Sequence, residues 1–160
     1  MLRVDSREHW THPGSRDRHL KDYFQRHGIT YRVEKLDVGD YMLDGGSLVI
    51  DRKSGLQELS TNLTNAADNA RFMREVRRAY NAGIKLVILI EQRGITCHDD
   101  VSSWRSKHTG VSGAELLKRM FRLEMAYGVR FMFCDKRSCG RRIMEILLLE
   151  NNPKFFSKLY

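Results

Sequence analysis

The run Leu86-Val87-Ile88-Leu89-Ile90 constrains the fold more than any other part of this sequence. It lies between Lys85 and Glu91 and is aliphatic at every position, without the polar alternation of a strand that has one wet face. Strands buried on both faces are typical of parallel sheets, because the helices that connect parallel strands cover both sides. The chain is therefore predicted to contain a central parallel strand at 85–91 with helices on each face.

Shorter patterns on either side of this run predict the rest of a mixed sheet. Ser112 followed by Glu115 matches the signature of a helix start, and Val33 is expected on the buried side of its strand. The first strands are expected to form a meander, after which helices alternate with buried strands. Strands are expected at 2–5, 29–36, 39–44, 47–51 and 129–134, and helices at 15–27, 56–63, 69–82, 112–127 and 137–149. The fold class is therefore α/β, a mixed central sheet flanked by helices, in one domain at 1–152 with a tail at 153–160.

The charge balance favours a polyanionic partner. The chain carries 28 lysines and arginines against 20 aspartates and glutamates, which gives a net charge of +8. Such a surplus favours nucleic acid, because binding releases the cations condensed on its phosphates, although solubility alone also explains a basic surface. Cys97, Cys134 and Cys139 have no Cys-x-x-Cys spacing, which argues against a disulfide framework and against a four-cysteine zinc site.

The apolar residues are spread too evenly for a membrane span. No stretch approaches the roughly 18 apolar residues of a membrane helix, and the first residues are charged where a secretion signal requires an apolar run. We therefore expect no membrane association and no secretion. The expected compartment is reducing, either cytoplasmic (nucleoid-associated) or nuclear.

A hairpin around Gly45-Gly46 is the first candidate for a functional site. With a two-residue loop at these glycines, antiparallel pairing joins positions whose numbers sum to 91, and so sets Asp40 against Asp51. Directly opposed side chains lie about 5 Å apart, so the two carboxylates would face each other. The side-chain period of two places Lys53 on the same face as Asp51. A bulge or a longer loop would break this register.

These three side chains suit a divalent cation. Two opposed carboxylates repel each other unless a positive charge lies between them, and Mg²⁺ prefers a few hard oxygen ligands while keeping sites for water and phosphate. The ammonium group of Lys53 would hold or polarise a water beside the phosphate. The alternative is an exposed hairpin end with solvated charges. The lysine two positions after the second acid favours the metal site, with Mg²⁺ as the expected ion and Mn²⁺ as its substitute.

The same residues resemble the paired signature of XPF/Hef-type structure-specific DNA endonucleases. Val38-Gly39-Asp40-Tyr41 followed by Val49-Ile50-Asp51-Arg52-Lys53-Ser54 is similar to their G-D-Y and (I/V)-E-R-K-x-x-x-D motifs. Val4-Asp5-Ser6-Arg7-Glu8 resembles the V-D-x-R-E start of that nuclease domain, and Arg71-Phe72 resembles the start of its R-F-x-x-Q helix. With 127–134 resembling the family's last strand, four motifs in the right order span residues 2–149.

The resemblance implies a restriction-endonuclease-like fold, divalent-metal-dependent cleavage of DNA, and homodimerisation through the nuclease domain. The DNA would be branched, or would carry a junction of single strand and duplex. The metal ligands would be Asp40, Asp51 and the backbone carbonyl of Arg52, and Lys53 would be the water-positioning base. The full set of catalytic residues would be Asp5, Glu8, Asp40, Asp51 and Lys53. The side chains that hold the site or contact the DNA phosphate would be Arg7, Arg52 and Arg71.

Departures from the family pattern leave other functions open. Asp51 stands where the family usually has glutamate, so its carboxylate reaches one methylene less far. The acid expected four positions after Lys53 is Gln57, with Glu58 next to it. No tandem helix-hairpin-helix module follows within these residues, so junction selectivity is not carried over. A non-catalytic DNA-binding or partner-binding module of the same fold is the alternative, and a nuclease directed at RNA is a third hypothesis.

Residues outside the motifs add weaker expectations. Lys107 and Arg141 are expected to contact DNA phosphates as parts of a summed basic surface, although each alone is more often a solvated charge. Glu91 ends the buried strand, where it lines a cleft or is simply solvated. A homodimer is also expected from the apolar helix at 116–125 and from Phe155-Phe156.

Overall fold

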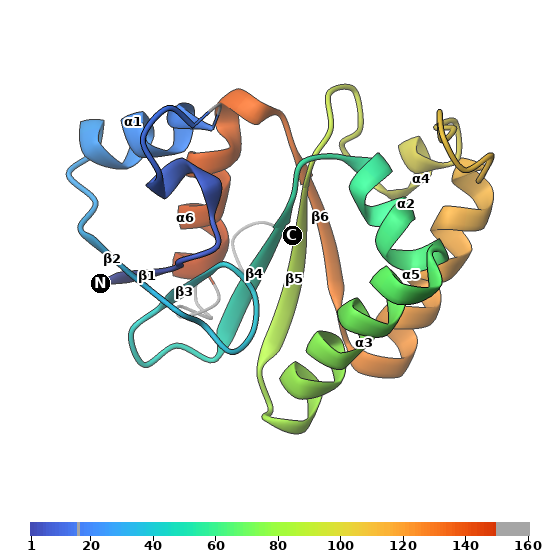
Figure 1. The fold of residues 1–160 in the computed structure, drawn as a ribbon, viewed down its shortest axis with the longest axis horizontal. Helices are drawn as coiled ribbons and strands as arrows, with labels where there is room; N and C mark the ends of the chain where they lie inside the picture. The colour runs from blue at the N-terminus through green and yellow to red at the C-terminus, as the bar shows by residue number, and fades with distance from the viewer. Residues whose placement is uncertain (16, 150–160) are drawn as a thin grey trace.

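The computed structural model describes residues 1–15 and 17–149, which form a six-stranded mixed sheet in the order β2-β1-β3-β4-β5-β6 (Figure 1). The strands are β1 Leu2–Asp5, β2 Tyr31–Glu34, β3 Tyr41–Leu43, β4 Leu48–Lys53, β5 Lys85–Glu91 and β6 Arg130–Cys134. The α-helices are α1 Arg18–Arg26, α2 Leu56–Thr64, α3 Ala66–Asn81, α4 His98–Val101, α5 Gly113–Tyr127 and α6 Cys139–Leu149. Short 3₁₀ turns occupy His9–Thr11 and Lys136–Ser138.

The aliphatic run forms β5, which is buried on both faces. It pairs in parallel with β4 and with β6, one position in from the β6 edge of the sheet. Leu86, Ile88 and Ile90 pack in the cluster that includes α2, α3 and α5, whereas Val87 and Leu89 pack in the cluster that includes α1 and α6. Figure 1 shows these two helical layers on opposite sides of the sheet. The predicted parallel strand covered on both faces is confirmed.

The N-terminal strands do not form the predicted meander. β1 lies between β2 and β3, parallel to β2 and antiparallel to β3. The meander prediction was wrong here because α1 lies between β1 and β2, and a helical crossover returns the chain parallel to the strand that it left. β2 is consequently an edge strand, and Val33, which was expected to be buried, is 45% exposed.

The hairpin keeps the predicted register although its turn is displaced. Tyr41 lies opposite Ile50, as the sum rule requires. The connection spans 44–47, and Gly46 N donates to Leu43 O at 3.0 Å, so the turn is centred one residue earlier than the sequence suggested. Gly45 has a φ of +70°, a conformation that glycine adopts without the steric cost of a side chain.

Most helix boundaries follow the sequence signals. The Ser112 hydroxyl accepts from Glu115 N at the start of α5, which confirms the predicted cap, and Gly128 ends that helix in the left-handed region. α3 begins earlier than predicted because the Asn65 side chain caps it by accepting from the N–H groups of its first turn. No helix among residues 1–15 and 17–149 is long and apolar enough to cross a membrane. The tail at 153–160, with Phe155-Phe156, lies outside the described residues.

Candidate active site

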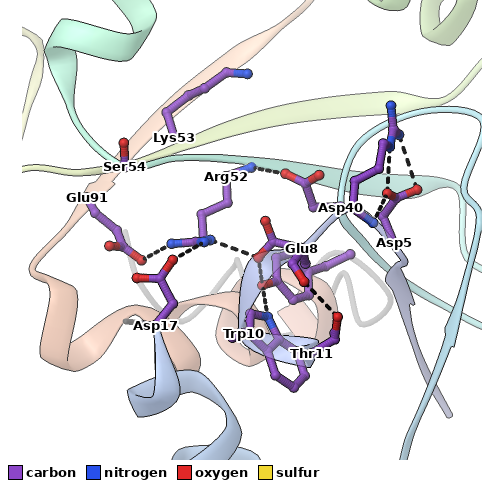
Figure 2. A network of polar contacts seen from close by, with 12 residues as sticks. Asp5, Glu8, Trp10, Thr11, Asp17, Asp40, Arg52, Lys53, Ser54 and Glu91 are labelled. Carbon is purple, nitrogen blue, oxygen red and sulfur yellow. Dashed lines mark hydrogen bonds and ion pairs between the residues drawn. The ribbon is translucent and has the colours of Figure 1, made fainter. Parts of the chain in front are cut away.

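One edge of the sheet gathers the residues that the motifs single out. β1, β4 and β5 run in the same direction, so the ends of all three strands meet the start of the antiparallel β3 at this edge. A cleft of about 510 Å³ opens here. It is lined by Arg7, Glu8, His9, Asp17, Asp40, Asp51, Arg52, Lys53, Ser54, Glu58, Arg71 and Glu75. Figure 2 shows the polar contacts that hold many of these side chains in place.

A backbone irregularity before β3 places Asp40. The ladder between β3 and β4 ends at Tyr41, and Asp40 N donates to Ile50 O at 2.7 Å. Gly39 has a φ of +63°, and a Cβ atom there would lie 2.1 Å from a methyl carbon of Val49. This tight approach turns the chain so that Asp40 Oδ2 accepts from Arg52 N at 2.7 Å.

The carboxylate of Asp40 thus takes the place of a backbone acceptor at the end of the ladder. The ladder does not extend to the predicted direct pairing of Asp40 with Asp51, because it stops one residue short. Both side chains nevertheless line the same cleft.

Asp51 and Lys53 form a buried ion pair on one side of β4. Lys53 Nζ lies 3.0 Å from Asp51 Oδ1, and only 4% of Asp51 is exposed. The predicted shared face of these two residues is confirmed. The other carboxylate oxygen of Asp51, Oδ2, is buried and has no hydrogen-bond partner among the described residues. A buried carboxylate oxygen without a partner is costly, so this atom can accept a hydrogen-bond donor or a cation.

Burial disfavours the charged forms of both carboxyl groups, and negative neighbours add to its effect. The pKa of Asp40 lies well above its ordinary value because the group is withdrawn from water and because Asp51 and Glu8 are negative neighbours. Burial likewise raises the pKa of Asp51 to about 6, even though Lys53 acts in the opposite direction. Perturbed carboxyl pairs of this kind are typical of functional sites.

This donor set fits a divalent cation. An ion held by Asp40 and Asp51 would supply a positive partner for Asp51 Oδ2, and it would offset the burial and the negative neighbours that raise both pKa values. Within 1–15 and 17–149, no three side chains of the histidine, cysteine, aspartate and glutamate types converge closely enough to hold a metal by themselves. The fit is therefore with an ion that completes its shell with water, backbone oxygen or phosphate, as Mg²⁺ does.

Arg52 lies on the opposite side of β4 from Lys53 and is the hub of a buried network (Figure 2). Its guanidinium donates to Glu8 Oε2 at 2.9 Å, to Glu91 Oε1 at 2.9 Å and to Asp17 Oδ2 at 3.0 Å. Burial alone would lower the pKa of Arg52, but Glu8, Tyr41 and Glu91 raise it above its ordinary value. Each of the three guanidinium nitrogens donates to one carboxylate, so Arg52 holds these acids together, and its expected contact with the DNA phosphate stays a prediction.

The two other predicted catalytic acids, Glu8 and Asp5, are each held by several hydrogen bonds. Glu8 Oε2 also accepts from the Tyr41 hydroxyl, which in turn accepts from Trp10 Nε1 at 2.6 Å. Asp5 accepts from Arg7 through both oxygens and from Leu36 N at 2.7 Å. Burial raises the pKa of Asp5, but these hydrogen bonds outweigh it, and the resulting pKa lies below the ordinary value. Glu8 lines the cleft, whereas Asp5 is not among the lining residues.

The first turn of α2 places Glu58, and not Gln57, at the cleft. Glu58 lines the cleft, and its Oε1 lies 4.0 Å from Lys53 Nζ. Gln57, which stands in the family position of the acid, turns away and accepts hydrogen bonds from Ser106 and Lys107. The carboxylate near Lys53 is therefore supplied one residue later in the sequence.

The predicted basic residues are divided between the cleft and other surfaces. Arg7 and Arg71 line the cleft, each paired with a neighbouring aspartate. Lys107 is exposed on a separate loop. Arg141 lines a second hollow of about 550 Å³ and lies 3.4 Å from Glu145. The roles expected for these side chains in binding DNA, and for the Arg52 carbonyl in binding metal, stay predictions.

Three residues at or next to the site belong to none of the sequence motifs. Asp17 binds Arg52 and also lies 3.2 Å from Lys136 Nζ, but it sits in an irregular segment without a pattern. His19 places Nε2 3.7 Å from Glu91, and burial lowers its pKa. Glu75 accepts from Gly39 N at 2.6 Å and so braces the turn before Asp40. Its position four residues after Arg71 on α3, hence on the same helix face, is the one signal that was available.

Comparison with known proteins agrees with this geometry. The family model described as the ERCC4 domain matches residues 4–145. No individual curated protein matches the chain. The structure of XPF from Aeropyrum pernix is similar with a TM-score of 0.67 and 19% identity, over 94% of this chain and 65% of that one. XPF from Aeropyrum pernix in complex with DNA is similar with a TM-score of 0.65 and 20% identity, over 95% and 65% of the two chains.

These similarities show the fold, which is the restriction-endonuclease-like mixed sheet that the sequence predicted. The chain spans 65% of the length of each of these two structures.

Proposed function

Because this chain belongs to the ERCC4 domain family, we propose that it is a divalent-metal-dependent DNA endonuclease whose active site is the cleft at Asp40, Asp51 and Lys53. The observation that carries the proposal is the partnerless oxygen of Asp51, buried beside an ammonium group in a cleft that also holds the carboxylate of Asp40. A purely structural ion pair has no need for a carboxylate oxygen without a partner. The net charge of +8 is consistent with a polyanionic substrate.

Asp40 and Asp51 would hold the metal, with the Arg52 carbonyl as a further ligand, and Mg²⁺ is the proposed ion with Mn²⁺ as its substitute. When bound, such an ion supplies Lewis acidity at the phosphate and lowers the pKa of its water. The hydrogen bond from Arg52 N to Asp40 Oδ2 fixes one carboxylate, and the Lys53 ammonium fixes the other. Both carboxylates are thereby oriented before any substrate arrives, which removes that cost from the reaction.

Lys53 is proposed to act as a hydrogen-bond donor. Burial lowers its pKa, but the charges of Asp51 and Glu58 more than compensate, so the pKa lies above the ordinary value and the amine stays protonated. A protonated amine orients an attacking water or stabilises the charge on the phosphate; it does not accept a proton. The role of water-positioning base that the family resemblance implies stays a prediction, because an ion held at Asp51 would offset one of the charges that raise this pKa.

Arg7 and Arg71 are proposed to neutralise the DNA backbone at the mouth of the cleft. Both are cleft-lining and largely exposed, in contrast with the enclosed Arg52. The similar XPF protein was solved in complex with DNA, which supports DNA as the partner of this chain. The proposed substrate is branched DNA or a junction of single strand and duplex.

The direct test is a cleavage assay with a panel of labelled nucleic acids. Single-stranded, duplex, flapped and forked DNA, and RNA of the same sequence, are incubated with Mg²⁺, with Mn²⁺ or with EDTA. The proposal requires metal-dependent cutting of at least one DNA, loss of cutting in Asp40→Asn and Lys53→Ala, and normal cutting in Asp44→Asn. Asp44 is the matched control, because it lies in the turn at the other end of the same hairpin. Cutting by both site variants at the parent's rate would show that the site is wrongly assigned.

A binding module of the same fold is the second candidate function. The orientation of Gln57 away from the cleft, and the lack of three converging metal-ligand side chains among the described residues, favour it. Metal-linked stability separates the two. A site saturated to a hundred times its Kd stabilises the fold by about 2.7 kcal/mol, which raises the Tm by roughly 5–11 °C for a chain of this length. A binding module would show no such rise with Mg²⁺ or Mn²⁺.

We further propose a homodimer formed partly through α5. Phe121 and Met125 on that helix are exposed, Met125 by 89%, and exposed apolar side chains of this kind are often covered by a partner. Light scattering at micromolar concentration should report twice the mass of the chain, and a strict monomer would remove the proposal. The cytoplasmic or nuclear compartment and the domain limits of 1–152 remain proposals as well.

A further inference from the structure

The glutamine that replaces the family acid anchors a loop beside the cleft. Gln57 Oε1 accepts from Ser106 Oγ at 2.9 Å and from Lys107 N at 3.2 Å. It is followed at once on α2 by Glu58, which lines the cleft. Successive helical residues project about 100° apart, so one side chain reaches the cleft while its neighbour reaches the loop. The substitution at position 57 thus connects the two.

The anchored segment, residues 105–110, is called here the basic loop. Ser106 Oγ accepts from the backbone N–H groups of His108 and Thr109, at 3.2 and 3.0 Å, and Ser106 N donates to Val111 O at 3.0 Å. A bridge between Arg105 and Ser112 closes the base of the loop. In Figure 1 the chain that follows α4 lies at the same upper end of the molecule as the start of α2. These hydrogen bonds hold the loop against the first turn of α2, one residue away from the cleft-lining Glu58, although no residue of the loop lines the cleft itself.

The basic loop carries exposed cationic side chains that form no ion pair among the described residues. Arg105, Lys107 and His108 are exposed, and neither Arg105 nor Lys107 forms an ion pair within residues 1–15 and 17–149. The arginines at the mouth of the cleft, by contrast, are each paired with an aspartate. Unpaired cations held at a fixed place by backbone and side-chain hydrogen bonds suit an extended anion such as a sugar-phosphate backbone.

We propose that the basic loop is a second contact with DNA, binding the phosphate backbone next to the cleft, and that Gln57 is the positioning residue that fixes the loop to α2. The inference rests on the proposed function for the identity of the polyanion. Lys107 supplies the phosphate contact, and Gln57 determines where that contact lies relative to Glu58 and the cleft.

The phosphate contact is tested by binding a fluorescein-labelled forked DNA in EDTA and measuring anisotropy at several salt concentrations. One phosphate contact contributes about 0.9 to the slope of log affinity against log salt, which amounts to about eightfold in Kd at 0.1 M salt. Lys107→Ala should weaken binding by about this factor and reduce the slope by about 1. Lys118→Ala, which removes an exposed lysine from α5, is the matched control and should leave both values near the parent's.

The positioning role is tested by a double-mutant cycle. Gln57→Met keeps the length of the side chain but removes the acceptor, so it should weaken binding while Lys107→Ala adds little in its background. Gln57→Glu keeps an acceptor, so the full effect of Lys107→Ala should persist there. Ser106→Ala removes the same hydrogen bond from the loop side. It replaces Gln57→Met in the cycle if Gln57→Met melts at a lower temperature than the parent.

Two results would overturn the inference. Unchanged affinity and slope in Lys107→Ala would show that the loop does not contact DNA, and full additivity with Gln57→Met would show that Gln57 does not act through it. The assay contains no metal, so failures are distinguishable. If the parent protein binds the forked DNA but never cuts it, the proposed nuclease activity is wrong and the proposed loop contact is unaffected. If the parent protein cuts DNA and Lys107→Ala binds the fork as tightly as the parent does, only the proposed loop contact is wrong.

Discussion

Asp51→Asn is expected to stabilise the metal-free protein while it abolishes cleavage. The pKa of Asp51 is about 6 in the folded chain, against an ordinary value of 3.8. At about 1.36 kcal/mol for each pKa unit, the ionised carboxylate costs the folded state about 3 kcal/mol at neutral pH. This figure already contains the favourable interaction with Lys53. An asparagine of the same shape carries no charge, so the variant escapes the cost.

The expected effect depends on pH in a defined direction. A carboxyl group whose pKa is raised by folding favours the folded state fully below its unfolded pKa, near 4, and loses that contribution as the pH rises through about 6. The stability difference between Asp51→Asn and the parent should therefore be close to zero at pH 4. It should grow to about 3 kcal/mol at pH 8, which corresponds to a rise in Tm of roughly 6–12 °C.

Urea unfolding in EDTA at several pH values measures this difference. Asp22→Asn is the control, because Asp22 is a partly exposed residue of α1 that lies 3.6 Å from Arg18, and surface pairs of this kind contribute at most about 1 kcal/mol. A variant at Asp51 that is no more stable than the parent at pH 8 would refute the reasoning. So would a gain that does not disappear toward pH 4.

Three further outcomes follow from the same structure. Arg52→Met should lower the free energy of unfolding by about 4 kcal/mol in thermal melts, because it leaves three carboxylates without their shared cation. Arg18→Met, on the exposed face of α1, should change the free energy of unfolding by less than about 0.5 kcal/mol. Gly39→Ala should cost more than Gly28→Ala by about 2 kcal/mol in urea unfolding, because both positions have positive φ but only Gly39 would place a Cβ against Val49. Cleavage by the parent at limiting Mg²⁺ should decline in acid, because a proton competes with the ion for Asp51, whose pKa without metal is about 6, and a rate at limiting Mg²⁺ that is flat between pH 5 and 8 would contradict that role.

The parts of the fold that the sequence predicted are those that local periodicity determines. β5 was predictable because five successive aliphatic residues fit a strand covered on both faces, and the packing of Val87 and Leu89 against a different layer from Ile88 bears this out. The hairpin register was predictable because the strand pair is short and closed by glycines. The position of β2 was not, because the alternation of its residues carries no record of which strand lies beside it.

The sequence predicted which acidic side chains line the candidate site, but not the hydrogen bonds that hold them in place. Asp40, Asp51 and Lys53 line one cleft as the motif spacing suggested. The detail that fixes Asp40, a hydrogen bond from Arg52 N made possible by the left-handed backbone at Gly39, depends on a close approach that the spacing does not encode.

Long-range contacts account for the rest. Asp17 joins Arg52 across 35 residues of sequence, and Gln57 joins Ser106 across 49. Such contacts depend on how the layers pack, and no periodic pattern in a single sequence specifies them.

The central claim is that Asp40 and Asp51 together hold one divalent cation, and calorimetric titration of the metal-free protein with Mn²⁺ tests it most directly. The account predicts one bound ion for each parent chain, with binding lost in Asp51→Asn and in Asp40→Asn and retained in Asp44→Asn. A parent that binds no Mn²⁺, or a pair of site variants that bind it as the parent does, would contradict the account.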